Sequence, residues 1–457
     1  MGFRKITFIG GGSYQWVPTL FRDIAVNPAL REGRFVLHDI DPERNAELAN
    51  VCRVIGRKVG ANIEVETELD LDRSLEGAEA VVLCISTGGL EAMEHDVEIP
   101  KKYGIYQPVG DSTGPGGISR TLRNVPVVTA IASRMEALCP DAWLLNLTNP
   151  MDQIVYAVSR TSKIKVVGLC HEFMGFMGTL ERILGLTDWR NEISVKIAGI
   201  NHFAWVLEAS ANGRDAFPPL RDYLKNVATE HAAESGPANG VNLSQSLSGN
   251  HVKFALFETF GAVPYPGDRH LVEYFPYFLS EKTRHGMDFG VLLTSIEDRK
   301  GAWMTSFKER IAEWTSDVAD SVPLEPSAES LAPILAALIG GGPSTVQPAT
   351  LMNTGQVENL PLGSSVETLA TFDSASVSPH ASGPLPLPIL GLVHKHCLIQ
   401  DLTVEGALKG DRDVVLQAML ADPLNNNNDF REIGRMLDEL LAANAVWLPQ
   451  FHGKRPG

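Results

Sequence analysis

The chain has 457 residues, of which 44% are hydrophobic and 21% charged, a composition typical of a globular protein with an ample core. Its formal net charge of −16 disfavours nucleic-acid and anionic-membrane partners, because such a surface repels polyanions. The five cysteines are widely spaced and form no CxxC pair, which favours reduced thiols over a disulfide framework. No apolar run has the length of a membrane span, and the N-terminal run is too short for a signal peptide, so the sequence predicts a cytoplasmic protein.

The N-terminus predicts a strand, a glycine turn and a helix. The β-rich run 4–9 ends at Gly10, Gly11, Gly12 and Ser13, and the segment WVPTLFRDIAV after this turn can form a helix. Backbone N–H groups in such a turn, together with a helix N-terminus, hold the pyrophosphate of a dinucleotide. Gln15 stands where GxGxxG has its third glycine, so a plain strand-to-helix turn remains the alternative.

The second predicted strand ends in an acidic residue. Residues 34–41, RFVLHDID, place Asp39 at the carboxyl end of the strand. A carboxylate at that point accepts hydrogen bonds from the ribose hydroxyls of NAD and repels the extra phosphate of NADP. A surface turn residue is the alternative. Asp41 and Pro42 then predict the start of a helix over residues 42–60.

The following segments predict further parallel strands. The apolar run 78–86 is typical of a strand buried on both faces, and its end at Ser86 and Thr87 lies on the ligand side of such a sheet. A helix is expected over 118–138, followed by a strand that ends before Asn149 and Pro150. Because strands and helices alternate up to residue 170, the sequence predicts an α/β fold with a doubly wound parallel sheet.

Two segments carry side chains suited to chemistry. Cys170, His171 and Glu172 follow an apolar run, and a thiolate, an imidazole and a carboxylate at one turn can hold a metal and move a proton. A buried structural cysteine and histidine are the alternatives. Residues 103–127 are rich in glycine and include charged side chains, which predicts an ordered binding loop rather than a flexible surface loop. The charged residues of this segment are Asp111, Arg120 and Arg123.

Several motifs, taken together and in order, resemble those of the family 4 glycoside hydrolases. They are GGGS, GDSTGPGGISRTLRNVPV, LNLTNP, GLCHE and GINHFAW, and the resemblance continues through GDRHLVEYFPYF, MNTGQVENLP and TVEGALKGDRDVVLQAMLADPL. It therefore covers almost the whole chain. It implies a fold similar to that of lactate and malate dehydrogenases, with a Rossmann-type NAD-binding domain over residues 1–190. Residues 191–457 would form an α+β domain that binds substrate and assembles homodimers or homotetramers.

The resemblance also implies two cofactors and a reaction. Family members are described as binding NAD and a divalent cation, usually Mn²⁺, whose protein ligands correspond to Cys170 and His202 here. One thiolate and one imidazole leave positions for sugar hydroxyls, so the cation can act on the sugar as a Lewis acid. The implied reaction is hydrolysis of an α-glycoside by oxidation, elimination, addition and reduction, with NAD regenerated in each turnover.

Residue roles follow from the matching positions. The motif GDRH places Asp268 where members that act on unphosphorylated α-glycosides have their base, and Tyr265 is the second candidate. His171 is expected to protonate the leaving oxygen. The residues expected to contact the sugar are Asn149, Asp111, Glu172 and Arg269, with a structural ion pair as the alternative for Arg269. The residues expected to bind NAD are Gly10, Gly11, Gly12, Ser13, Asp39, Ser86 and Thr87.

The sugar is inferred from departures from the family pattern. Met93 stands where many phosphosugar members carry arginine, and no cluster of basic residues is evident, which argues against a 6-phosphate. The CHE triplet resembles α-glucosidase members, and the Glu172 carboxylate would repel a uronate unless it points away. We therefore expect an α-glucoside or α-galactoside. The alternatives are an α-glucuronide or α-galacturonide, an NAD-dependent dehydrogenase of a sugar or hydroxy acid, and a non-catalytic sensor.

Overall fold

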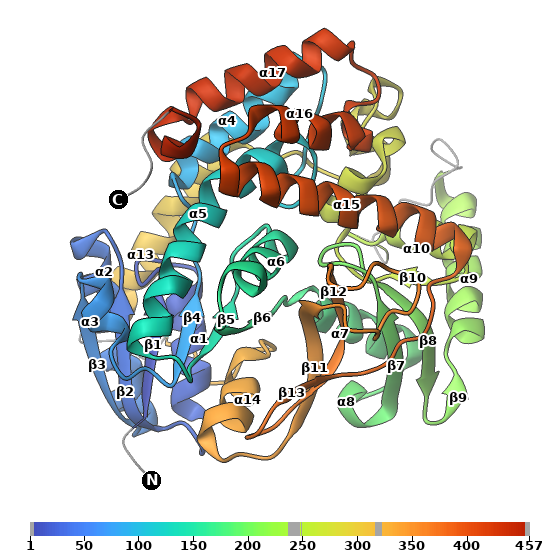
Figure 1. Ribbon diagram of the computed structural model, residues 1–457. Coiled ribbons are helices and arrows are strands. Elements are labelled where there is room, and N and C mark those ends of the chain that lie inside the picture. Colours follow the sequence, from blue (N-terminus) through green and yellow to red (C-terminus); the bar gives the residue numbers. More distant parts are fainter. Residues whose placement is uncertain (1–3, 236–246, 248, 316–321, 453–457) are drawn as a thin grey trace.

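A nine-stranded sheet lies at the centre of the fold in the computed structural model, which describes residues 4–235, 247, 249–315 and 322–452 (Figure 1). The strand order is β3-β2-β1-β4-β5-β6-β11-β12-β13. The first six strands in this order are parallel, and the last three are antiparallel to their neighbours. The order 3-2-1-4-5-6 confirms the predicted doubly wound dinucleotide-binding sheet.

The strands of this sheet are short, and those at its centre are the most deeply buried. Their bounds are β1 (Lys5–Ile9), β2 (Glu32–His38), β3 (Asn62–Glu68), β4 (Ala80–Leu83), β5 (Trp143–Asn146), β6 (Lys165–Gly168), β11 (Thr345–Met352), β12 (Ser365–Phe372) and β13 (Val377–Pro379). Each strand of the central pair β1 and β4 is buried at every position, as expected for parallel strands covered on both faces.

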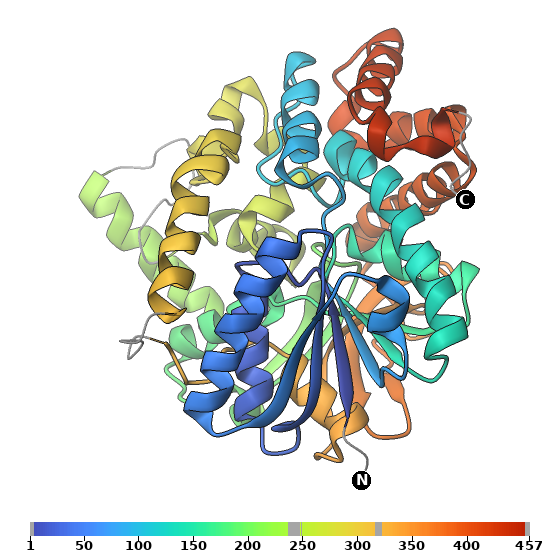
Figure 2. The same ribbon diagram turned by 90° about the vertical axis from the view of Figure 1, so that its left-hand side faces the viewer.

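Helices cover both faces of the sheet (Figure 2). One face packs against α1 (Trp16–Val26), α2 (Pro42–Val59), α13 (Met304–Thr315) and α14 (Leu331–Leu335). The other face packs against α3 (Leu71–Leu75), α5 (Gly114–Leu138) and α6 (Met151–Thr161). Helix α4 (Gly89–Lys102) follows β4 and lies against α5.

Capping residues set both ends of α2 at the positions that the sequence predicts. The Asp41 side chain accepts hydrogen bonds from the backbone N–H groups of Glu43 and Arg44, and Pro42 occupies the first turn. At the other end Gly60 has a φ of 64°, a left-handed conformation that glycine adopts at low cost. Local signals therefore set both ends of this helix.

The glycine-rich segment 103–127 is a loop only as far as residue 113. Helix α5 begins at Gly114, so the helix predicted from residue 118 starts a turn earlier and the expected loop is shorter. A Cβ on Gly117 would lie 2.5 Å from the carbonyl carbon of Ser112, and one on Gly116 would lie 2.8 Å from the carbonyl oxygen of Gly110. These glycines allow the first turn of α5 to pack closely on the loop. The high glycine content of this segment therefore reflects close helix packing and not a longer irregular loop.

The second half of the chain adds a small sheet and two helical layers. The small sheet contains β7 (Ile193–Ala198), β8 (Trp205–Ala211), β9 (Arg214–Asp215) and β10 (Val263–Pro264). It packs with α7 (Glu172–Leu184), α8 (Trp189–Glu192), α9 (Phe217–Ser235) and α10 (His251–Phe260). The chain continues with α11 (Asp268–Leu271) and α12 (Ile296–Asp298), and it closes with α15 (Leu387–Lys409), α16 (Arg412–Ala421) and α17 (Phe430–Ala443) above α5 (Figure 1).

The expected division into residues 1–190 and 191–457 stays a prediction. Strands β11–β13 come from the second half and extend the sheet of the first, so the two halves share one sheet. Among the described helices, none combines the length and the apolar character that crossing a membrane requires.

Candidate active site

The glycine turn after β1 lies against the end of β2. The backbone N–H groups of Gly10 and Gly11 both donate to the carbonyl oxygen of His38 at 2.9 Å. Gly10 has a φ of 100°, and a Cβ there would lie 2.0 Å from the carbonyl oxygen of Cys84 at the end of β4. A side chain at this position is therefore excluded, and the turn packs closely against the end of β4.

Asp39 fixes this turn through its carboxylate. One oxygen accepts the N–H of Gly12 at 2.7 Å, and the other accepts the N–H of Asp41 at 2.9 Å. Asp39 is partly exposed, and Ile40 after it is 96% exposed, so the carboxylate lies at an open edge of the sheet. This is the position from which a carboxylate can reach ribose hydroxyls.

The other expected cofactor residues lie at the ends of β1 and β4, which are neighbours in the sheet. The Ser13 hydroxyl accepts the N–H of Trp16, and the Ser86 carbonyl accepts the N–H of Gly89 at the start of α4. Thr87 is held on both sides, since its N–H donates to Asn124 Oδ1 and its carbonyl accepts from Arg123 Nε. These loops therefore lie together at the carboxyl ends of neighbouring parallel strands.

Arg123 forms a fully buried ion pair with Asp96 of α4. Both side chains have no exposed surface. Arg123 Nη1 donates to Asp96 Oδ1 at 2.8 Å, and Nη2 donates to Oδ2. Because the same guanidinium also holds the carbonyl of Thr87, the pair links α4 and α5 to the loop after β4.

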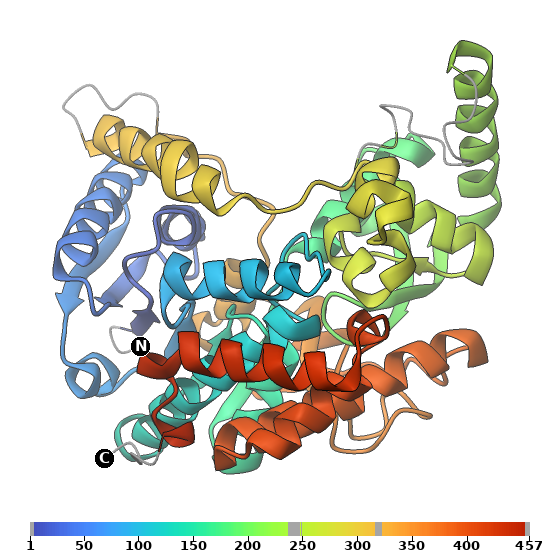
Figure 3. The same ribbon diagram turned by 90° about the horizontal axis from the view of Figure 1, so that it is seen from above.

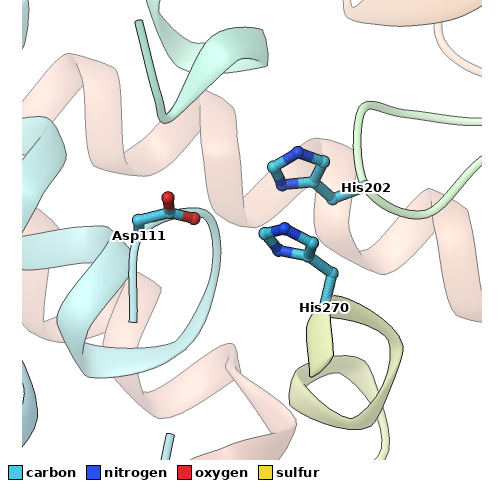
Figure 4. A group of neighbouring side chains, drawn as sticks. All are labelled: Asp111, His202 and His270. Atoms are coloured by element: carbon cyan, nitrogen blue, oxygen red, sulfur yellow. The ribbon is translucent and has the colours of Figure 1, made fainter. Parts of the chain in front are cut away.

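The most prominent group of possible metal ligands comprises Asp111, His202 and His270 (Figure 4). One ligand atom from each residue lies within 4.8 Å of the others. The two imidazoles stack with their ring centroids 3.7 Å apart. His202 adopts a φ of 61°, which is uncommon for a non-glycine residue and positions its ring from the turn between β7 and β8.

A serine hydroxyl orients His202. Ser112 Oγ lies 2.7 Å from Asp111 Oδ1 and 2.7 Å from His202 Nδ1. Since an ionised carboxylate can only accept, the hydroxyl donates to Asp111 and accepts from Nδ1–H, which leaves the lone pair of Nε2 for a metal. Burial and the neighbouring His270 lower the pKa of His202 to about 3, so the imidazole is neutral at neutral pH, as a ligand must be.

Cys170 lies outside that 4.8 Å group and is linked to it through Asn201, the residue before His202. The Asn201 side chain hydrogen-bonds to the Cys170 sulfur, although burial and the nearby Glu367 carboxylate raise the pKa of the thiol well above its usual value. Asn201 Nδ2 also donates to Glu367 Oε2 at 3.0 Å. A bound cation would offset the raised pKa of the thiol, because metal coordination favours the thiolate.

Glu367 belongs to a buried polar network beneath Cys170. It is 1% exposed and also accepts from Thr350 Oγ1 at 2.9 Å, while its Oε1 is buried with no partner in the described chain. Burial raises its pKa to about 7. Asp152, in the same network, accepts from the N–H of Asn201 at 2.9 Å.

Glu172 faces the imidazoles. Its Oε2 accepts the N–H of Gly267 at 2.7 Å, and its Oε1 lies 3.8 Å from His270 Nε2 and 4.0 Å from His171 Nε2. Burial by itself would raise the pKa of Glu172, but the surrounding histidines, His270 first, outweigh it and lower the pKa to about 2. The carboxylate is therefore ionised and directed at α11 and the imidazoles. The His171 side chain is half exposed, with its ring centroid 5.5 Å from that of Trp16.

The two candidate bases occupy different surroundings. Asp268 is 3% exposed, and its two oxygens accept the N–H groups of Val252 and Lys253 at 2.9 and 3.0 Å, so the carboxylate caps the N-terminus of α10. Burial raises its pKa, and Lys253 opposes this shift. The hydroxyl of Tyr265 is buried with no hydrogen-bond partner in the described residues, and its ring packs edge-on against Phe173.

Asn149 lies beside the metal-capable group. Its Nδ2 donates to Asp111 Oδ2 at 3.1 Å, and its backbone carbonyl accepts from Arg120 and Asn124. Its Oδ1 is buried without a partner in the described chain, so one strong acceptor is left for a ligand. Arg269 forms hydrogen bonds with the carbonyl of Pro108 and the hydroxyl of Thr294 rather than the ion pair considered from the sequence.

Sequence reasoning missed His270, Ser112, Asn201 and Glu367. His270 follows Asp268 and Arg269 within GDRH, and the motif alone does not tell which of its side chains faces the site. Asn201 directly precedes His202 and could have been suspected from that adjacency. Glu367 lies far from the motifs in sequence and carries no local signal.

A doubly wound sheet with a glycine turn and an acidic residue at neighbouring strand ends, together with a partly buried donor set suited to a divalent cation, defines an α/β enzyme of the dinucleotide-binding type. The model of the family 4 glycosyl hydrolases matches residues 5–186, and that of the family's C-terminal domain matches residues 197–425. The chain belongs to this family and is a glycoside hydrolase, which confirms the resemblance seen in the sequence.

Two curated relatives match over almost the full length of both chains. An alpha-galacturonidase of Lachnoclostridium phytofermentans is 35% identical over 463 residues, covering 98% of this chain and 97% of that protein. An alpha-galactosidase of Bacillus subtilis is 31% identical over 456 residues, covering 98% and 100%. The similarity therefore spans the whole fold, including the part that carries Glu367.

Two solved structures are similar as well. A putative glucosidase of Bacillus subtilis superposes with a TM-score of 0.87 at 31% identity, covering 96% of this chain and all of that one. A 6-phospho-alpha-glucosidase from gut microorganisms, whose structure is described as a complex with NAD and Mn²⁺, has a TM-score of 0.80 at 19% identity, covering 98% and 100%. At 19% identity, the similarity to the second structure supports the fold alone.

Proposed function

We propose that the protein hydrolyses α-glycosides with NAD and a divalent cation, Mn²⁺ first, as cofactors. The observation that carries the proposal is the group Asp111, His202 and His270 with the unpartnered acceptor of Asn149 beside it. The names of the relatives, alpha-galacturonidase and alpha-galactosidase, support an α-linked sugar. The structural neighbour that holds NAD and Mn²⁺ supports the cofactors.

The residues present fit both cofactors. Added Cβ atoms at Gly10, Gly11 and Gly12 would collide with neighbouring atoms of the chain, which is the close strand-to-helix packing of a dinucleotide-binding turn, and the Asp39 carboxylate lies beside this turn at the end of β2, where it can reach a ribose. His202 offers Nε2, and Cys170 lies next to Asn201 in the same region. An imidazole and a thiolate suit a transition metal that also accepts sugar oxygens.

When bound, the nicotinamide supplies a hydride acceptor and donor, and the cation supplies Lewis-acid polarisation of the sugar oxygens. The side chains of the protein position the sugar and transfer protons. Asn149 Oδ1 accepts a hydrogen bond from a sugar hydroxyl, and Asp111 holds the Asn149 side chain in place. His171 donates a proton to the leaving glycosidic oxygen. The half-exposed position of His171 allows it to exchange that proton with solvent.

A base must remove the proton on sugar C2. We keep Asp268 as the proposed base and Tyr265 as the second candidate. The surroundings distinguish them, because the Asp268 oxygens are engaged by backbone N–H groups while the Tyr265 hydroxyl has no partner in the described chain. Kinetics of the D268N and Y265F variants identify the base. The variant that lacks the base should have a kcat that falls far more than its KM rises.

The experiment that tests the function measures nitrophenol release from p-nitrophenyl α-D-galacturonide, α-D-galactoside and α-D-glucoside with NAD, Mn²⁺ and a reductant. Each addition is then omitted in turn. Nitrophenol release that requires both NAD and metal, without accumulation of NADH, supports the proposal. NADH that accumulates in step with product identifies a dehydrogenase instead and refutes it.

We also propose a homodimer or homotetramer in the cytoplasm. Helix α15 exposes Leu387, Leu398 and Leu408, apolar side chains suited to contact with a second copy. The cysteines are free thiols, in keeping with a reducing compartment. Light scattering on the purified chain tests the oligomer.

A further inference from the structure

A short segment that follows His270 reaches the parts of the chain that carry the other two members of the metal-capable group. It is the single 3₁₀ turn η2 (Val272–Tyr274), which belongs to the motif GDRHLVEYFPYF. The proposed reaction uses the first residues of this motif and leaves Glu273 and Tyr274 without a role. Glu273 is 1% exposed and Tyr274 is 3% exposed, so the contacts of both side chains lie inside the protein.

Glu273 holds the loop that carries Asp111. Its Oε1 accepts the N–H groups of Val109 and Gly110, at 2.7 and 2.8 Å. Gly110 has a left-handed φ of 66°, a conformation in which successive N–H groups can face one acceptor. Figure 3 shows this loop, after the light-blue helix α4, beside the yellow segment that contains η2. Because Asp111 follows Gly110 directly, these bonds fix the backbone from which its carboxylate extends.

The second oxygen of Glu273 holds the same loop through Gln107. Gln107 Nε2 donates to Glu273 Oε2 at 3.4 Å and to the carbonyl of Thr113 at 2.9 Å. Gln107 Oε1 accepts the N–H of Gly116, in the first turn of α5, at 2.9 Å. The loop is therefore held on both sides of Asp111.

Tyr274 holds the turn that carries His202. Its hydroxyl donates to the carbonyl of Asn201 at 3.2 Å, and its ring stacks on that of Phe203 with the centroids 4.2 Å apart and the planes 7° apart. These two contacts are to the residues on either side of His202. A φ of 61° at a non-glycine residue persists where the surrounding structure over-determines it, and the contacts of Tyr274 contribute to this.

We propose that Glu273 and Tyr274 are positioning residues that preassemble the metal-capable group for a divalent cation. Glu273 sets the place of Asp111, and Tyr274 sets the place of His202. Both directly continue the segment of His270, so one turn of the chain fixes the spacing of three segments that are far apart in sequence (Figure 4). This inference rests on the proposed function, because it concerns the cation of that reaction.

The test titrates the purified full-length apoprotein with Mn²⁺ and follows free Mn²⁺ by electron paramagnetic resonance, without NAD or substrate. E273M removes both oxygens at a similar side-chain size and should weaken Mn²⁺ affinity by about 10–100-fold. E273Q keeps a carbonyl oxygen for the N–H groups of Val109 and Gly110 and should stay within about 3-fold of the wild type. Y274F keeps the stacked ring, loses the bond to Asn201 and should weaken affinity by about 10-fold.

Two matched controls separate positioning from a general loss of stability. D23L removes a buried carboxylate of α1 that accepts the N–H of Ser327 at 2.8 Å. Y103F removes a hydroxyl that donates to Glu439 Oε2 at 3.2 Å. Neither residue belongs to η2, to the loop 107–113 or to the turn of His202. Both variants should bind Mn²⁺ as the wild type does, even where their melting temperatures fall.

The outcomes separate this inference from the proposed function. Equal Mn²⁺ affinity in the wild type, E273M and Y274F, each folded by circular dichroism, overturns the inference and leaves the function standing; Y274F alone decides if E273M does not fold. A loss as large in E273Q as in E273M, or as large in the controls as in E273M and Y274F, also overturns it. A wild type that binds Mn²⁺ but hydrolyses none of the p-nitrophenyl glycosides overturns the function and leaves the inference standing. A wild type that binds no Mn²⁺ overturns both.

Discussion

Replacement of Glu367 by leucine tests whether the buried network beneath Cys170 prepares the metal site. Leucine removes the acceptor of Asn201 Nδ2 and of Thr350 Oγ1, which Glu367 holds at 3.0 and 2.9 Å. Asn201 Nδ2, left buried without this acceptor, costs about 1–3 kcal/mol, and Thr350 Oγ1 keeps only the weak acceptor Met151 Sδ at 3.5 Å, so the fold should lose at least about 1–3 kcal/mol. The freed Asn201 amide no longer fixes Cys170 and the adjacent His202. Loss of such an orienting partner weakens metal affinity by about 10–100-fold.

The assay titrates the apoprotein with Mn²⁺ and follows free Mn²⁺ by electron paramagnetic resonance, which measures binding without turnover. E367Q keeps a carbonyl acceptor in nearly the same shape and should fall between the wild type and E367L. E358L, which removes an exposed carboxylate in the neighbouring loop, is the control and should bind Mn²⁺ as the wild type does. Equal affinity in E367L and the wild type, under conditions where C170S abolishes binding, would refute the reasoning.

Further predictions concern the cofactor turn, the buried ion pair and a buried carboxyl. D39A should weaken NAD binding in calorimetry by about 10–100-fold, because the Gly12 turn loses its acceptor and the ribose its partner; unchanged affinity contradicts the role of Asp39. D96A should lower the free energy of unfolding by about 3–5 kcal/mol since it leaves the Arg123 charge buried alone, whereas E405A at an exposed pair should cost less than about 1 kcal/mol; similar losses in denaturant melts would contradict this. Burial raises the pKa of Glu273 to about 8, so the native state keeps a proton that the unfolded state releases, and the wild type loses stability relative to E273Q as pH rises from about 4.5 to 8. A stability difference between the two that is constant over that pH range argues against the raised pKa.

Local signals in the sequence predict the nucleotide-binding half well. The glycine turn after β1, the acidic residue at the end of β2 and the cap of α2 each depend on residues adjacent in the chain, and the structure has all three. The glycine-rich segment shows the limit of such signals. Gly116 and Gly117 belong to a helix, and their role in close packing against Gly110 and Ser112 depends on contacts that only the folded chain makes.

The sequence predicts several residues of the candidate site, but it does not predict how their side chains are arranged in space. His202, Asp111 and Asn149 were expected from motifs, and the structure brings them together. It adds His270, and it holds Cys170 through Asn201 rather than within the tight group. Motifs name residues on separate segments, whereas the distances between them depend on how α11 packs against the loop before α5.

Hydrolysis in D₂O tests whether glycosidic cleavage proceeds through removal of the proton on sugar C2. The galacturonide and the galactoside are each hydrolysed to completion with NAD and Mn²⁺, and the released sugar is examined by proton NMR. We expect deuterium at C2 of the product and none at C3, because the base would exchange its proton with solvent whereas the hydrogen at C3 would be held on the cofactor. A product that keeps its original hydrogen at C2 would rule out removal of the C2 proton.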